Sequence, residues 1–184
     1  MERVIAEAEA GRYELDYAQQ PPFGSFSGTY LGEVAVGIPL YDPEARLDVL
    51  KRRVAEYPAA LRLAVVRDYL WSAEFGLTAF APKFAARSDI YGTAACLTRA
   101  VNQLILALFA LNRKYLINDK TALEEVAELE RAPAEFGTRV QETLACLGHS
   151  AAELAAAVEG IERLLAETLE VTDGLYQPRY AMLK

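Results

Sequence analysis

The feature that most constrains the fold is a long apolar stretch that begins near residue 88 and ends near residue 115. Residues 104–111 are apolar on all sides, which predicts a central helix that other helices surround. Polar residues also recur along one face of this helix, at spacings of three or four: Asp89, Thr93, Cys96, Arg99 and Gln103. An unpaired buried polar group costs about 1–3 kcal/mol. The stripe is therefore predicted either to be paired internally or to line a site, and Arg99 to need a buried anion.

Helical patterns fill most of the chain after residue 42. We predict helices over about 42–56, 59–75, 121–130, 133–148 and 150–170, with a broken helix or connection over 76–84 around Pro82. Asp42 and Ser88 are predicted N-caps, and Ser150 with Glu153 forms a capping box. The fold class is therefore mainly α, a bundle of about five to six helices with a short N-terminal β-hairpin.

The first 41 residues carry the predicted hairpin. Arg12–Ala18 alternates between apolar and polar residues and predicts a strand. Gln19–Gly32 is rich in Pro, Gly and Ser and predicts a loop, and Glu33–Leu40 predicts a second strand. Two strands alone are marginally stable, so they would need helices or a sheet supplied by another segment. We divide the chain into residues 1–41 and a helical bundle over 42–184.

Composition narrows the function classes. The net charge of −7, from 19 basic and 26 acidic residues, argues against broad nucleic-acid binding. Two distant cysteines and a single histidine, His149, argue against a disulfide framework, a zinc cluster or a histidine triad. The run 104–111 is shorter than the roughly 20 residues that span a bilayer, and no signal peptide opens the chain. We predict a cytoplasmic protein without a membrane partner.

Five polar residues have both a structural and a functional interpretation. Asp89 either caps the long helix or, beside Arg87, accepts a proton from a substrate hydroxyl at the mouth of a cleft. Asn112 either bonds a loop or contacts a ligand, and Lys120 either faces water or reaches a phosphate. Asp16 is either an exposed strand acid or a ligand for Mg²⁺, which prefers few carboxylates. Spacing alone leaves these alternatives open.

The order of four segments resembles a known family: RYELDYA, IPLYDPEARLDVLKRRVAEYP, the helix opening RSD, and ALNRKYLINDK. It is similar to the C-terminal part of bacterial nucleotidyltransferase-like proteins of the polymerase-beta superfamily, distantly of the kanamycin and lincosamide nucleotidyltransferases. The resemblance covers most of residues 12–148. In such proteins a small mixed sheet carries the metal-binding acids and a following helical bundle binds substrate.

The resemblance assigns roles to individual residues. It implies that residues 1–41 are the remnant of a catalytic sheet and that 42–184 bind substrate. Asp16 would be the third acid of the metal site, and Asp89 the base for an acceptor hydroxyl. The substrate or nucleotide would lie in a cleft faced by the remaining predicted site residues: Arg87, Arg99, Asn112, Tyr115 and Lys120.

The chain departs from the family pattern at the catalytic motif. The Gly-Ser turn followed by Asp-x-Asp on a strand is absent, and one acid cannot organise two metal ions. We therefore predict a nucleotide- or substrate-binding domain that is inactive alone, with Mg²⁺ and a nucleoside triphosphate bound only alongside a missing catalytic region. The alternative is a stand-alone helical-bundle interaction protein, which self-associates or pairs with a separate catalytic chain through apolar surface near residues 12–40.

Overall fold

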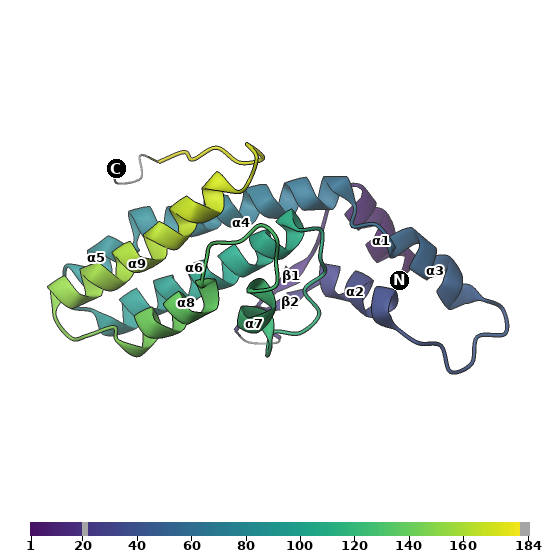
Figure 1. The fold of residues 1–184 in the computed structure, drawn as a ribbon, viewed down its shortest axis with the longest axis horizontal. Coiled ribbons are helices and arrows are strands. Elements are labelled where there is room, and N and C mark those ends of the chain that lie inside the picture. Colours follow the sequence, from purple (N-terminus) through teal and green to yellow (C-terminus); the bar gives the residue numbers. More distant parts are fainter. Residues whose placement is uncertain (20–21, 181–184) are drawn as a thin grey trace.

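A computed structural model describes residues 1–19 and 22–180. As predicted, the fold is mainly α with a short antiparallel hairpin near the N-terminus (Figure 1). The elements are α1 (Glu2–Glu9), β1 (Leu15–Asp16), β2 (Ser25–Phe26), α2 (Gly28–Val36), α3 (Arg46–Val54), α4 (Ala59–Ala79), α5 (Ala81–Ala85), α6 (Ile90–Leu111), α7 (Ala122–Val126), α8 (Phe136–Ala145) and α9 (Ala151–Glu170).

Helix α6 is the centre of the bundle, as its composition predicted. It packs along α4 and also contacts α5, α7 and α9, while α8 packs on α9 (Figure 1). Every residue from Gln103 to Leu111 is buried. Burying one Leu, Ile or Phe side chain stabilises the folded state by about 1.5–3 kcal/mol. The continuous apolar run therefore holds α6 inside the protein.

The N-terminal segment differs from the prediction. The hairpin has two residues in each strand, with Leu15 opposite Phe26 and Asp16 opposite Ser25, so β2 lies where we predicted a loop. The predicted strand over 33–40 is wrong, because α2 occupies its first half. Leu31 and Val34 lie about one helical turn apart, and both are buried in the core. That packing outweighs the alternation from which a strand was predicted.

Polar side chains accept hydrogen bonds from the first N–H groups of α3, α6 and α9, as predicted, but two of these helices begin at other residues than predicted. The carboxylate of Asp42 accepts hydrogen bonds from the N–H groups of Arg46 and Leu47 at 2.9 and 2.8 Å, so α3 begins four residues later than expected. Ser88 is not the cap of α6. It has a left-handed backbone, and Asp89 is the cap instead. The capping box of Ser150 and Glu153 at the start of α9 is confirmed.

Helix α6 also bears on the membrane prediction. By length and composition alone, its 22 residues are apolar enough to cross a membrane, although the run 104–111 is too short. Within the protein, 67% of its most apolar window is buried. This burial is compatible with the core helix of a soluble protein.

One hydrophobic core joins the two predicted units of the chain. It includes Ile5 of α1 and Phe26 of β2 together with Leu104 of α6 and Ile161 of α9. The segment after α9 folds back over α4, where the fully buried carboxylate of Glu74 accepts hydrogen bonds from it. The core therefore continues across residue 41 and reaches the C-terminal segment.

Candidate functional site

Two adjoining cavities lie where the hairpin packs over α4 and α6. The first, about 410 Å³, lies between the loop after β1 and the outer face of α6. The second, about 630 Å³, lies between residues 11–17 and α4. Three residues line both cavities: Tyr17, Tyr69 and Gln103. We call the pair the tyrosine cleft, because Tyr13, Tyr17, Tyr69 and Tyr91 together supply much of its wall.

Aromatic packing holds the hairpin in place above the cleft. The ring of Tyr13 lies edge-on to Phe26, with centroids 5.4 Å apart, and stacks on Tyr69 at 5.8 Å. The Tyr13 hydroxyl donates to Asp68 of α4 at 2.9 Å. Burial and then the nearby Tyr69 raise the pKa of Tyr13 well above its ordinary value, so its hydroxyl stays protonated and remains a donor at neutral pH. The hairpin is therefore pinned to α4 by one hydrogen bond and two aromatic contacts.

Tyr69 is the unusual residue of the cleft. Its side chain is only 4% exposed, and among the described residues its hydroxyl is the one buried side-chain polar atom without a hydrogen bond of full geometry; a weaker interaction joins it to the Tyr13 hydroxyl. Burial also raises the pKa of Tyr69, so the hydroxyl keeps its proton. Leaving such a group unpaired costs about 1–3 kcal/mol. Folding therefore leaves this hydroxyl with an incomplete hydrogen bond, which a ligand that reaches it would complete.

Gln103 brings a second polar group to the same wall. Its side chain is buried, and its Nε2 donates to the hydroxyl of Ser72 at 2.7 Å. No described residue donates to its carbonyl oxygen in turn, and the side chain lines both cavities. Ser72 lines the larger cavity beside it. Gln103 and Ser72 thus place an amide and a hydroxyl within reach of a ligand that contacts Tyr69.

Arg99 lies at the open side of the cleft rather than beside a buried anion. Its guanidinium is exposed and lies 5.5 Å from the ring centroid of Tyr17, an arrangement in which the ring attracts the cation. The prediction that Arg99 needs a buried anion is therefore wrong, because water solvates the charge. Its position in the lining of the smaller cavity still places a cation beside any ligand there.

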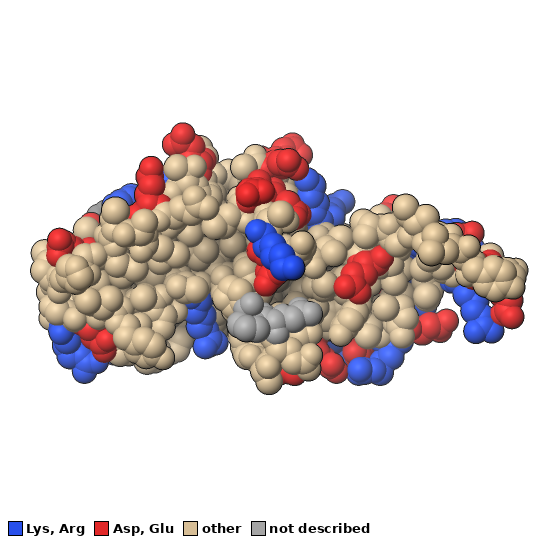
Figure 2. Space-filling model, turned by 90° about the horizontal axis from the view of Figure 1, so that it is seen from below, with Lys and Arg blue, Asp and Glu red and all other residues tan. Residues whose placement is uncertain are grey.

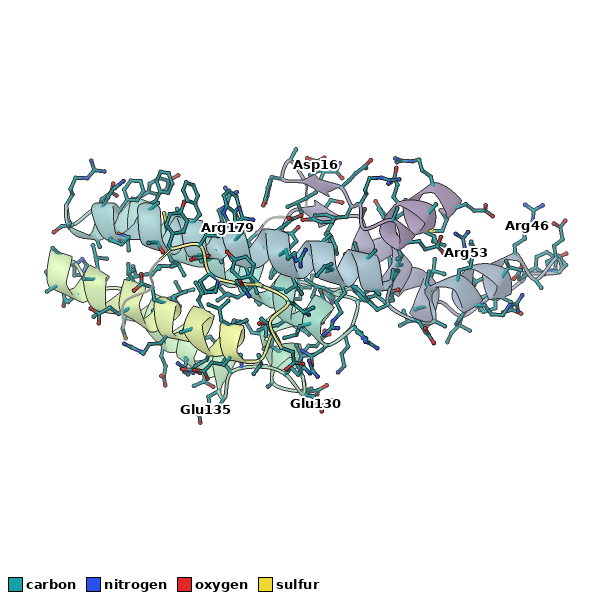
Figure 3. All side chains as sticks on the ribbon, turned by 90° about the horizontal axis from the view of Figure 1, so that it is seen from above. Asp16, Arg46, Arg53, Glu130, Glu135 and Arg179 are labelled. Carbon is teal, nitrogen blue, oxygen red and sulfur yellow. The ribbon has the colours of Figure 1, made fainter. Side chains whose placement is uncertain are left out.

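Asp16 does not assemble a metal site with other described residues. It lies in the hairpin at the edge of the molecule (Figure 3), and its carboxylate accepts hydrogen bonds from Ala18 N at 2.8 Å and Gln19 Nε2 at 3.2 Å. Within residues 1–19 and 22–180, no group of three or more His, Cys, Asp or Glu side chains gathers in a way that could hold a metal ion. Asp16 and the other described acids therefore do not fit a complete Mg²⁺ site.

Asp89 and Arg87 have structural contacts outside the cleft. The Asp89 carboxylate accepts a hydrogen bond from Gly92 N at 2.9 Å and so caps α6, while its carbonyl accepts one from the Thr93 hydroxyl. The Arg87 guanidinium lies 5.5 Å from the ring centroid of Phe84. Neither Asp89 nor Arg87 lines either cavity. Of the two interpretations for Asp89, these contacts are those of the helix cap.

The residues after α6 are spread over three places. The Asn112 amide donates to two carbonyls, those of Leu108 and Arg131, and its oxygen accepts from Arg131 N at 2.9 Å. The Tyr115 hydroxyl donates to the Val54 carbonyl at 3.2 Å, and burial raises the pKa of Tyr115 to about 12. Lys120 is exposed beside a separate cavity of about 260 Å³. The predicted cleft residues are therefore not brought together, and only Arg99 lines the tyrosine cleft.

Comparison with known proteins identifies a family. The family described as Domain of unknown function (DUF4037) matches residues 23–120, more than half of the 184-residue chain. The chain belongs to this family. No curated protein and no solved structure matches it. The DUF4037 match includes Tyr69, Arg99 and Gln103 of the cleft, whereas Tyr13 and Tyr17 precede it.

Sequence reasoning overlooked part of the cleft. Gln103 belonged to the polar stripe of the long helix, and Tyr13 and Tyr17 shared one face of the predicted strand. Those two patterns, taken together, were the available signal. Tyr69 gave none, because an aromatic residue in an apolar helix is ordinarily part of the core and its hydroxyl partner depends on tertiary structure.

Proposed function

We propose that this chain is the substrate-binding helical domain of a nucleotidyltransferase-like protein, and that the tyrosine cleft holds its nucleotide or acceptor substrate. The observation that carries the proposal is the wall that both cavities share, in which the buried hydroxyl of Tyr69 has no hydrogen bond of full geometry. Tyrosine rings supply faces on which a planar base or sugar ring stacks. Gln103 and Arg99 add an amide and a cation beside them.

The same chemistry sets what the domain would do. The rings and buried polar groups orient the ligand, and Arg99 attracts its negative charge. The chain has no Asp-x-Asp pair after its Gly24–Ser25 dipeptide, so we propose that it binds without catalysing transfer until a catalytic region is supplied. Mg²⁺ and the reacting phosphates would enter with that region.

A conservative substitution at Tyr69 tests the proposal. Tyr69→Phe removes only the hydroxyl, so the thermal unfolding midpoint is expected to stay equal or rise, because an unpaired buried group is removed. Binding of nucleoside triphosphates, measured by isothermal titration calorimetry, is expected to weaken about tenfold, the equivalent of one lost hydrogen bond of about 1.4 kcal/mol. Tyr57→Phe is the matched control, since Tyr57 is a buried tyrosine that stacks on Tyr115 and lines neither cavity.

Two results would contradict the proposal. One is wild-type protein that binds no nucleoside triphosphate or nucleoside at millimolar concentration. The other is a Tyr69→Phe protein that binds as tightly as wild type, because the hydroxyl would then take no part in binding. An equal loss of binding in Tyr57→Phe would point to a general effect on folding instead.

A second candidate function rests on a different surface. The end of α2 and the segment after it expose four large hydrophobic side chains: Val36, Ile38, Leu40 and Tyr41. Leu40 is 99% exposed and Ile38 is 83% exposed. Contiguous exposed apolar residues mark interaction surfaces, which favours a protein that self-associates or pairs with a catalytic chain. Light scattering over a dilution series tests self-association: a monomer at every concentration would contradict it, and Leu40→Asp should dissociate any dimer.

A further inference from the structure

A further cavity, of distinct chemistry, lies at the C-terminal end of α6. It measures about 400 Å³, and three arginines line it: Arg62 of α4, Arg113 just after α6, and Arg131 in the segment before α8. Two carboxylates, Glu130 and Asp173, complete its charged lining. Figure 3 shows Glu130 on the edge of the molecule opposite Asp16, so this arginine cavity is separate from the hairpin and its tyrosine cleft.

The three guanidinium groups are not all neutralised by the protein. Arg131 forms a salt bridge with Asp173, while Arg62 Nε donates to the backbone carbonyl of Leu111 at 3.2 Å. Among the described residues, Arg113 has no salt bridge and its guanidinium makes no hydrogen bond, and Arg62 has no carboxylate partner. Glu130 forms no salt bridge with the described residues either, so the three arginines and two carboxylates of the lining leave one positive charge in excess, in a chain whose net charge is −7.

The three guanidinium groups lie close enough to repel one another when no ligand is bound. Burial, followed by repulsion from Arg113 and Arg131, lowers the pKa of Arg62, and attraction to Asp173 offsets only part of that effect. On the face of the protein in Figure 2, by comparison, Lys and Arg side chains are interspersed with Asp and Glu side chains. A concentration of guanidinium groups at one concave site is the arrangement that attracts anions.

The backbone at Arg113 has a conformation that favours glycine. Arg113 has a left-handed backbone, with φ of 56°, and its N–H bonds to the Ala110 carbonyl as the chain leaves α6. Glycine takes this position at helix ends without steric cost, whereas other residues are disfavoured there. Asp173, across the same cavity, is also left-handed, with φ of 53°. Glycine would fit position 113 without steric cost, so Arg113→Gly removes the guanidinium without burdening the fold.

We propose that Arg62, Arg113 and Arg131 form a binding site for an oxyanion of the phosphate class. Arg62 and Arg113 form no salt bridge with the described residues, and the planar fork of arginine suits pairs of phosphate oxygens. The Arg131–Asp173 salt bridge holds the third guanidinium at the rim. This proposal does not depend on the function assigned to the tyrosine cleft.

Pyrophosphate is the probe for the test, titrated into the full chain by calorimetry. Arg113→Gly removes one of the free cations and also relieves the left-handed strain, so the fold is not put at risk. We expect this variant to bind pyrophosphate at least tenfold more weakly, with a thermal midpoint equal to or above that of wild type. Arg46→Gly is the matched charge control, because Arg46 lies at the far end of the molecule at the start of α3 (Figure 3) and should bind as wild type does.

The outcomes separate a real site from general attraction. Wild-type protein that gives no binding up to about 1 mM pyrophosphate would overturn the proposal, as would equal affinity in wild type and Arg113→Gly, or an equal loss in Arg46→Gly. ATP identifies the source of the anion. If Arg113→Gly weakens ATP and pyrophosphate binding by the same factor, the site accepts nucleotide phosphates; if only pyrophosphate binding is weakened, it takes the free anion.

Discussion

The C-terminal segment is fastened to α4 by one buried carboxylate, and this makes Glu74 a sharp test of the fold. Glu74 is fully buried in α4, and one of its oxygens accepts from the Tyr176 hydroxyl and from Arg179 N at 3.1 Å. The other accepts from Tyr180 N at 2.6 Å. A carboxylate accepts with both oxygens, which is what three converging donors require.

Glu74→Gln keeps the size of the side chain but replaces one accepting oxygen with an amide that donates. At least one of the three donors then faces another donor. Hydrogen bonds to a charged acceptor contribute about 1.5–3 kcal/mol each, so Glu74→Gln should lower the free energy of unfolding by about that amount. Glu74→Ala leaves all three donors without an acceptor, and a loss of about 3–5 kcal/mol is expected.

Urea unfolding followed by circular dichroism measures the free energy, and limited trypsin digestion reports on the segment itself. Trypsin cleaves after Arg179, whose N–H is held by Glu74 in the wild type, so both variants should be cut there faster. Glu56→Gln is the control, because Glu56 is exposed and forms no side-chain hydrogen bond with the described residues. Two results together would contradict this role for Glu74: a free energy of unfolding for Glu74→Gln within about 0.5 kcal/mol of the wild-type value, and equal rates of trypsin cleavage after Arg179 in this variant and in the wild type.

Three further perturbations test acid stability, alkaline stability and one tight helix contact. Backbone N–H groups bonded to its carboxylate lower the pKa of Glu153 from 4.5 to about 2, so its stabilisation is present above pH 4.5 and is lost as the pH falls to 2. Glu153→Gln should lower the thermal midpoint at pH 7, and the gap to wild type should close over that range. Burial raises the pKa of Tyr115 from 10.0 to about 12, so its contribution is full below pH 10 and declines as the pH rises to 12. Tyr115→Phe should therefore lose less stability over that alkaline range, measured by circular dichroism, and an identical loss would contradict this. Gly92→Ala places a Cβ in steric conflict with a ring carbon of Phe84 and should lower the free energy of unfolding in urea by about 1–3 kcal/mol. Gly76→Ala is the control, since nothing lies within 4 Å of the added atom, and it should stabilise α4 by about 0.5–1 kcal/mol.

The helices could be predicted because their signals are local. The capping box at Ser150 and the apolar run of α6 both follow from spacing within one element, and both are present in the structure. The segment over 28–36 could not be predicted in the same way. Its apolar residues satisfy both a strand and a helix pattern, and only the packing of Leu31 and Val34 in a core built by distant helices decides between them.

The candidate site divides along the same line. Arg99 and Gln103 line one cleft because a single straight helix holds residues four apart on one face. Asn112 and Lys120 come after the end of α6, where the chain turns, and they line two other cavities. Tyr69 depends on a missing partner, which is a property of the whole fold and has no sequence signal.

Helix α6 contributes residues to both proposed sites, at different positions along its axis. It carries Gln103 into the tyrosine cleft and Leu111 to the arginine cavity, eight residues or about 12 Å further along its axis. The tyrosine cleft and the arginine cavity share no lining residue. Perturbations at separated sites without shared partners usually add. Tyr69→Phe and Arg113→Gly should therefore act independently, the first on nucleoside binding and the second on pyrophosphate. A double variant whose losses differ from the sum would show that one ligand bridges both sites.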